Sequence, residues 1–190
     1  DFPSKFGEDR PLIAAIIRKN EVIVPTGNNK IEPNDLIYFV SEAQKLEKIL
    51  TLFGKKIIPI QRALIIGGGR IGERLAEQLE ADSIKTKIIE SDINRCHYLS
   101  KKMEHAVVLH GDGSDQKLFQ EENLCLSDVV VSVTNDDETN ILVSLLAKNL
   151  GVENTISRIS KSTYFPLLAT IGIEKIVSPR LSAVSSILKD

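Results

Sequence analysis

Hydrophobic and polar positions follow two different patterns along the chain, and the change comes near residues 55–62. After it, short apolar runs alternate with longer stretches whose apolar residues recur every three to four positions, which predicts strands alternating with amphipathic helices. The predicted strands cover residues 63–66, 86–89, 106–109, 128–133, 155–158 and 175–177. The predicted helices cover residues 72–80, 94–103, 115–122, 137–150 and 161–170, and a further helix begins at Ser178-Pro179.

This alternation predicts a parallel sheet with helices on both faces. Six strands with a glycine-rich turn after the first indicate a Rossmann-like, doubly wound α/β fold. Before residue 55 the pattern predicts strands over 12–18, 22–25 and 36–40 and a helix over 42–53. These few elements make a thin core. We therefore expect a small partial α+β subdomain over 1–54, a linker over 55–61 and the Rossmann-like domain over 62–190.

The turn after the strand at 63–66 contains the pattern G-x-G-x-x-G, with Gly67, Gly69 and Gly72 at its three fixed positions. The first glycine permits a tight turn, the second lets the backbone approach a pyrophosphate, and the third packs the helix against the strand. Phosphates would lie at the N-terminus of the next helix, where free N–H groups favour negative charge. The pattern also occurs by chance, so its context decides its meaning.

Glu90 ends the next strand, at the place where a dinucleotide-binding fold has an acid for the ribose hydroxyls. The alternative is that Glu90 only begins a polar loop. Because a carboxylate repels a 2′-phosphate, NADP is disfavoured. Strand, glycine turn, helix, strand and acid in this order predict nucleotide binding.

Other candidate residues follow later strands, because ligands of open α/β sheets gather at the carboxyl ends of the strands. Asp112 is a candidate for the adenine amino group, or alternatively part of a turn before Asp115 as a helix cap. Thr134 and Asn135 follow the strand at 128–133, where they could line a nucleotide.

Three further side chains have two interpretations each. The neighbouring acids Asp136 and Asp137 favour helix capping over an acid–base pair. Arg158 could contact phosphate, since guanidinium pairs bidentately with it, or form a surface ion pair. Arg70 could reach either a phosphate or a neighbouring subunit.

Composition excludes some partners. The net charge of −2 gives no reason to expect nucleic acid, and no apolar run approaches the ~18 residues that cross a bilayer. Cys96 and Cys125 have neither metal-site nor disulfide spacing. We therefore expect a soluble, reduced, cytosolic chain without a metal, and its two ends suggest a piece of a longer protein.

Catalysis is not expected. A dehydrogenase needs a substrate pocket and a proton donor beside the nicotinamide, and of the three histidines only His110 lies near a strand end. The residues therefore favour a nucleotide-sensing regulatory module with no catalytic residue. The alternatives are an NAD-dependent oxidoreductase fragment that lacks its substrate domain, and an assembly domain with a vacant nucleotide fold.

Four runs of sequence resemble the regulator-of-potassium-conductance (RCK or KTN) family: GGGRIGERLA, IIESD, LHGDGSD and VSVTNDDETNILVSLLAK. The run IAAIIRKNEVIVPTGNNKIEPNDLIYFV resembles the smaller C-terminal RCK subdomain. The resemblance spans nearly the whole chain and implies the end of one C-terminal subdomain over 1–54, followed by an N-terminal dinucleotide-binding domain over 62–190 that is truncated at its C-terminus. The chain departs from the family at Gly113-Ser114, where Ala-Thr is usual, and at Asn34-Asp35, where Gly-Asp is often found.

The resemblance also implies a function. It implies a cytosolic regulatory subunit, peripheral at the inner face of the membrane, that forms homo-oligomers through RCK domains and controls a membrane potassium uptake system. It would switch conformation on binding NAD(H) or ADP/ATP. The implied nucleotide contacts are Gly67, Gly69, Arg70, Ile71, Gly72, Glu90, Gly111, Asp112, Thr134, Asn135 and Arg158.

Overall fold

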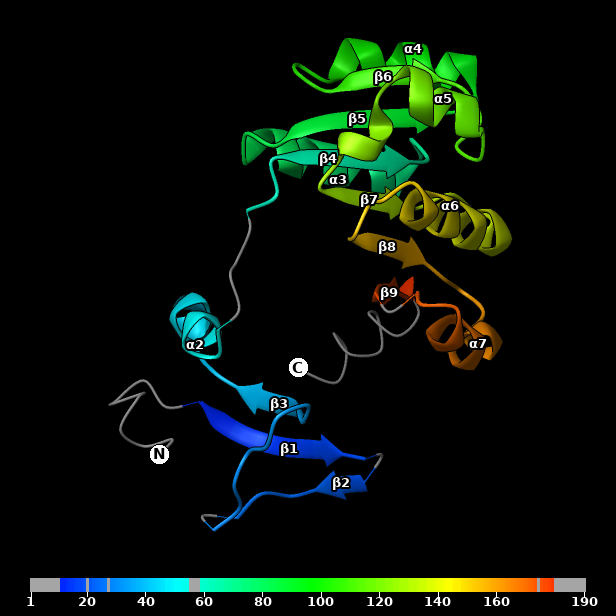
Figure 1. The fold of residues 1–190 in the computed structure, drawn as a ribbon. Helices are drawn as coiled ribbons and strands as arrows, with labels where there is room; N and C mark the ends of the chain where they lie inside the picture. Colours follow the sequence, from blue (N-terminus) through cyan, green and yellow to red (C-terminus); the bar gives the residue numbers. More distant parts are fainter. Residues whose placement is uncertain (1–10, 20, 27, 55–58, 174, 180–190) are drawn as a thin grey trace. The chain divides into compact units, whose positions relative to one another are not determined.

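The computed structural model describes residues 11–19, 21–26, 28–54, 59–173 and 175–179. The chain divides into two compact units, the first ending at Pro59 and the second beginning at Ile60 (Figure 1). That residues 1–54 form part of an RCK C-terminal subdomain stays a prediction.

The first unit contains a three-stranded antiparallel sheet in the order β2-β1-β3. Strand β1 (Leu12–Arg18) pairs with β2 (Glu21–Ile23) on one side and with β3 (Leu36–Val40) on the other. The helix expected over 42–53 begins as a 3-10 turn, η1 (Ala43–Lys45), and continues as α2 (Leu46–Leu52). The second strand is displaced from the expected 22–25, because pairing with β1 extends it to Glu21 and ends it at Ile23.

Arg18, at the end of β1, holds the turn that precedes β3. Its Nε and Nη2 donate to the two carboxylate oxygens of Asp35, at 2.9 and 2.8 Å, and Asp35 also accepts from the N–H of Glu32 at 2.8 Å. The hydrogen bond from Arg18 lowers the pKa of Asp35 from 3.8 to about 2. The ion pair between Arg18 and Asp35 thus fixes this turn.

We expect Asp35→Asn to lower the melting temperature of the first unit at pH 7 and to have little effect at pH 2. In the unfolded chain Asp35 takes up a proton near pH 3.8, but in the folded unit only near pH 2. Its stabilisation is therefore complete above pH 3.8 and is lost as the pH falls through about 2. Thermal melting followed by circular dichroism at several pH values checks this. Glu42→Gln, which removes the exposed pair with Lys45, is the control, and a pH-independent difference for Asp35→Asn would contradict the assignment.

The second unit is built on a six-stranded sheet in the order β6-β5-β4-β7-β8-β9, and all its neighbouring strands are parallel (Figure 1). The strands are β4 (Arg62–Ile66), β5 (Lys85–Glu90), β6 (Val107–His110), β7 (Val129–Ser132), β8 (Thr155–Arg158) and β9 (Lys175–Val177). The strand order reverses between β4 and β7, which confirms the predicted doubly wound, Rossmann-like fold.

The helices lie where the periodicity predicts them, with ends shifted by a few residues. They are α3 (Arg70–Ala81), α4 (Ile93–Lys102), α5 (Gln116–Glu121), α6 (Asp137–Asn149) and α7 (Phe165–Thr170), with 3-10 turns η2 (Leu124–Leu126) and η3 (Ser162–Tyr164). The helix expected at 161–170 is divided, because its first turn is η3. The helix expected from Ser178-Pro179 lies mostly outside the described residues. Within the described part of the chain, no helix is long and apolar enough to cross a membrane.

The core has two layers because side chains of β4 alternate between the faces of the sheet. Leu64 and Ile66 pack on one face in a cluster with residues of α5 and α6, while Ile65 packs on the other with residues of α3 and α4. The apolar residues Ile71, Leu75 and Leu79 recur every four positions along α3. Leu75 and Leu79 pack against the core, but Ile71 is 45% exposed because it lies in the first turn of α3, directly after the glycine turn.

Candidate functional site

A cavity of about 530 Å³ opens at the carboxyl ends of β4, β5, β6 and β7, across the point where the strand order reverses. Its size is within the range of small-molecule sites. The predicted residues that line it are Gly67, Gly69, Glu90, Gly111, Asp112, Thr134 and Asn135. Arg70, Ile71, Gly72 and Arg158 do not line it. The cavity also includes Ser91, Gly113 and Thr139, which are not among the predicted site residues although each is close in sequence to one of them.

The three motif glycines have different surroundings. Gly67 has a φ of +102°, and a Cβ there would lie 2.9 Å from the backbone N of Thr134. A Cβ on Gly72 would lie 2.0 Å from the carbonyl oxygen of Gly67, so the helix can approach the turn only without a side chain. A Cβ on Gly69 would meet no atom within 4 Å. Gly69 therefore leaves open space beside the cavity that it lines.

The N-terminus of α3 differs from the N-termini of the next three helices. Gly69 caps α3 without a side-chain hydrogen bond. The caps of α4, α5 and α6 are Asp92, Asp115 and Asp136, and each carboxylate accepts from backbone N–H groups of the first turn. The capping predicted for Asp115 and Asp136 is thus confirmed, and the first turn of α3 keeps N–H groups that a ligand anion can bind.

Glu90 lies half-buried at the end of β5, between the glycine turn and the next helix. Its Oε2 accepts from the N–H of Gly68 at 2.7 Å, and its Oε1 accepts from the N–H of Asp92 at 2.9 Å. The carboxylate therefore orders the turn while it also lines the cavity. Its position excludes the view that it only begins an exposed loop.

Asp112 has a turn role in the structure. One of its carboxylate oxygens accepts from the N–H and from the hydroxyl of Ser114, both at 2.8 Å. The hydrogen bond from the backbone of Ser114 lowers the pKa of Asp112. Asp112 still lines the cavity, so a contact with adenine stays a prediction.

Asn140, on α6, is fully buried and ties the wall of the cavity to the sheet. Its Oδ1 accepts from the N–H of Thr134 at 2.9 Å and from its hydroxyl at 2.8 Å. Its Nδ2 donates to the carbonyl oxygens of Thr134 and Arg158, at 3.1 and 2.9 Å. Asn140 is not among the residues predicted from the sequence. An amide on the core-facing stripe of a helix, in line with buried Val143 and Ala147, is the signal that points to it.

Arg158 holds the same loop from β8. Its Nη1 donates to the carbonyl oxygen of Thr134 at 2.6 Å and to Oδ1 of Asn135 at 3.2 Å. The alternative, a surface ion pair, is not found among the described residues, since the partners of Arg158 there are neutral. The phosphate contact stays a prediction, and Arg158 is not among the residues that line the cavity.

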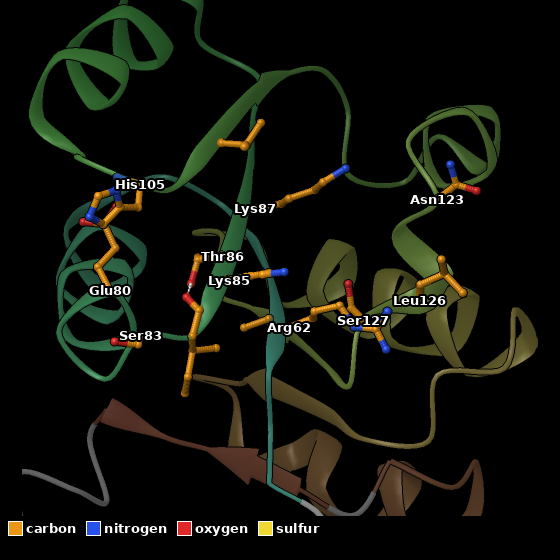
Figure 2. Close-up of a pocket in the computed structure, with 13 residues that line it drawn as sticks. Arg62, Glu80, Ser83, Lys85, Thr86, Lys87, His105, Asn123, Leu126 and Ser127 are labelled. Carbon is orange, nitrogen blue, oxygen red and sulfur yellow. Dashed lines mark hydrogen bonds between the residues drawn. The ribbon is translucent and has the colours of Figure 1, made fainter.

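A second cavity of about 570 Å³ lies at the opposite edge, beside the amino ends of β4, β5 and β6 (Figure 2). Figure 2 shows Lys85 and Lys87 extending from β5 toward one side of it, with Glu80 and His105 on the other. Lys87 donates to the carbonyl oxygen of Glu122 at 2.8 Å. Although this cavity is the larger, ligands of doubly wound sheets bind at the carboxyl edge, so the candidate site is the first cavity.

Known proteins resemble this chain in sequence and in fold. The Trk system potassium uptake protein trkA homolog 1 of Methanosarcina mazei is 39% identical over 179 residues, which cover 94% of this chain and 44% of that protein. The chain spans about two fifths of the length of the curated relatives it matches.

Two solved structures share the fold. The GsuK channel bound to NAD superposes with a TM-score of 0.61 at 21% identity, covering 99% of this chain and 32% of that one. GsuK bound to ADP superposes with a TM-score of 0.55 at 18% identity, covering 63% and 31%. The TrkA-N domain profile matches residues 63–179, which is more than half of the chain. The resemblance seen in the sequence is thereby confirmed, and the chain belongs to the TrkA-N domain family.

Proposed function

We propose that this chain is the nucleotide-binding part of a cytosolic regulatory subunit that controls a membrane potassium uptake system, and that it is not an enzyme. The observation that carries the proposal is the uncapped N-terminus of α3, with Gly69 open to a cavity that Glu90 also lines. The names of the relatives support the transport role, and the GsuK structures with NAD and ADP support the ligand class.

The residues present fit an adenosine diphosphate group. Backbone N–H groups from Gly69 to Gly72, at the N-terminus of α3, would hold the diphosphate, and Glu90 would accept hydrogen bonds from the ribose hydroxyls. Asp112, Thr134 and Asn135 would line the rest of the nucleotide. Because NAD(H), ADP and ATP share this group, all of them are proposed ligands. When bound, the nucleotide would supply a binding free energy that differs between conformations of the protein. No covalent bond would be made or broken.

Regulation would follow from a difference in affinity between two conformations. A nucleotide that binds one state tenfold better contributes about 1.4 kcal/mol of bias per site. Several sites in a homo-oligomer formed through RCK domains would add their contributions. The assembly would lie at the inner face of the membrane, against its transporter partner, and residues 1–54 would belong to the C-terminal subdomain of the preceding RCK unit.

We expect Glu90→Gln to weaken ADP binding by about 1.5–3 kcal/mol, or roughly 10- to 150-fold, because hydrogen bonds to charged groups are worth that much. The substitution keeps the size of the side chain and removes the charge. Isothermal titration calorimetry with ADP and with NAD measures the effect. Glu104→Gln, at an exposed position after α4, is the control. Unchanged affinity in Glu90→Gln would remove Glu90 from the site, and turnover of NADH by the full-length protein would overturn the non-enzymatic role.

A further inference from the structure

Arg95, in the first turns of α4, reaches the glycine turn from the side of the helix layer. Its Nε donates to the carbonyl oxygen of Gly68 at 2.7 Å, and its Nη2 forms an ion pair with the carboxylate of Glu73 on α3. The guanidinium also lies 4.7 Å from the ring centre of Tyr98. These three contacts hold the side chain, which is 28% exposed, in one place.

Gly68 is therefore held through both of its backbone groups. Its N–H donates to Glu90 and its carbonyl oxygen accepts from Arg95. The carbonyl of Gly68 and the N–H of Gly69 belong to one planar trans peptide and point in opposite directions. When Arg95 fixes the carbonyl, it also directs the N–H of Gly69 away from α4. Gly69 is the residue of this peptide that lines the cavity.

We propose that Arg95 is a positioning residue for diphosphate binding, which acts by fixing the peptide between Gly68 and Gly69 so that the Gly69 N–H is presented to the ligand. This inference rests on the proposed nucleotide-binding function. Glycine has no Cβ and adopts many backbone conformations, so a turn of three consecutive glycines needs outside contacts to keep one peptide orientation. Arg95 supplies this contact without touching the ligand.

An arginine suits the task better than a lysine. The planar guanidinium offers Nε to the Gly68 carbonyl and Nη2 to Glu73 at the same time, in a fixed geometry. Glu73 remains charged as the anchor, since hydrogen bonds from Lys102 and Arg95 lower its pKa. Lys102 pairs with Glu73 and Glu77, so it belongs to the same ion cluster without a contact to Gly68.

The test compares ADP with adenosine, which lacks the diphosphate. We expect Arg95→Gln to weaken ADP binding about tenfold, the effect of one lost hydrogen bond to a charged ligand, and to leave adenosine binding unchanged. NMR titration measures both affinities. In the nucleotide-free protein, the amide signal of Gly69 should shift in Arg95→Gln. Lys102→Gln is the matched control, and it should change neither the ADP-to-adenosine ratio nor the Gly69 signal.

Other outcomes overturn the inference. An equal loss for ADP and adenosine would show a general structural role, and no loss for either ligand would show no role. Full ADP affinity in Arg95→Lys would show that charge alone suffices. Glu73→Gln, which removes the anchor, should shift the ratio in the same direction by less, and this keeps the test open if Arg95→Gln folds poorly. A wild-type protein that binds neither ADP nor NAD would overturn the proposed function together with this inference, and so differs from failure of Arg95 alone.

Discussion

Gly69→Ser is expected to stabilise the nucleotide-free protein slightly and to weaken ADP binding about 100-fold. Serine is a preferred N-cap residue, and a cap of this kind gains a few tenths of a kcal/mol over glycine. Its hydroxyl would accept from the N–H groups of α3 that are proposed to hold the diphosphate, and its Cβ would enter open space beside the cavity. Losing two hydrogen bonds to a charged ligand accounts for a 100-fold effect.

Thermal melting measures the expected gain in stability, and calorimetry with ADP measures the expected loss of affinity. Gly69→Ala is the matched comparison, because it fills the same space without a capping hydroxyl and should lose ADP affinity without stabilising the helix. The φ of Gly69 is −63°, so neither substitution strains the backbone. If both variants bind ADP as tightly as the wild type does, the diphosphate does not lie at the N-terminus of α3.

The local parts of the fold follow from the sequence. Most strands of the second unit contain a short apolar run, and α4, α5 and α6 each begin after an aspartate that caps the helix. The glycine turn is predictable because Gly67 and Gly72 leave no room for a Cβ, against Thr134 and against the carbonyl of Gly67 respectively. Glu90 is predictable because one helix and one strand lie between it and the glycine turn, and the lengths of these two elements set its position in the sequence.

Contacts between distant residues are not predictable in this way. In the sequence, Arg95 has no feature that distinguishes it from the other polar residues of α4. Its hydrogen bond to the carbonyl of Gly68 depends on how α4 packs beside the turn. Arg158 can bind any acceptor within its reach, and the structure alone shows that the acceptors are a carbonyl and an amide. Ile71 has the right spacing for the core, but its place in the first turn of α3 leaves it exposed.

Asn140→Leu is expected to reduce the free energy of unfolding of the second unit by about 3 kcal/mol. Leucine fills a similar space, but the N–H of Thr134 and the carbonyl of Arg158 lose the buried amide that pairs with them, at about 1–3 kcal/mol for each unpaired group. Urea unfolding followed by circular dichroism measures the change. Leu142→Asn, at an exposed position of the same helix, should stay within about 0.5 kcal/mol of the wild type.

Asn140→Asp distinguishes the contribution of the amide oxygen, which accepts, from that of the amide nitrogen, which donates. The carboxylate keeps an acceptor for Thr134 but has no donor for the carbonyls of Thr134 and Arg158. It also buries a charge against these two oxygens, so we expect a loss at least as large as for leucine. If leucine costs no more than the substitution at position 142, the contacts of Asn140 do not stabilise the unit. If leucine is destabilising and aspartate is not, the bond to β8 contributes little, and the fold depends on Asn140 mainly for the loop at Thr134 that forms the cavity wall.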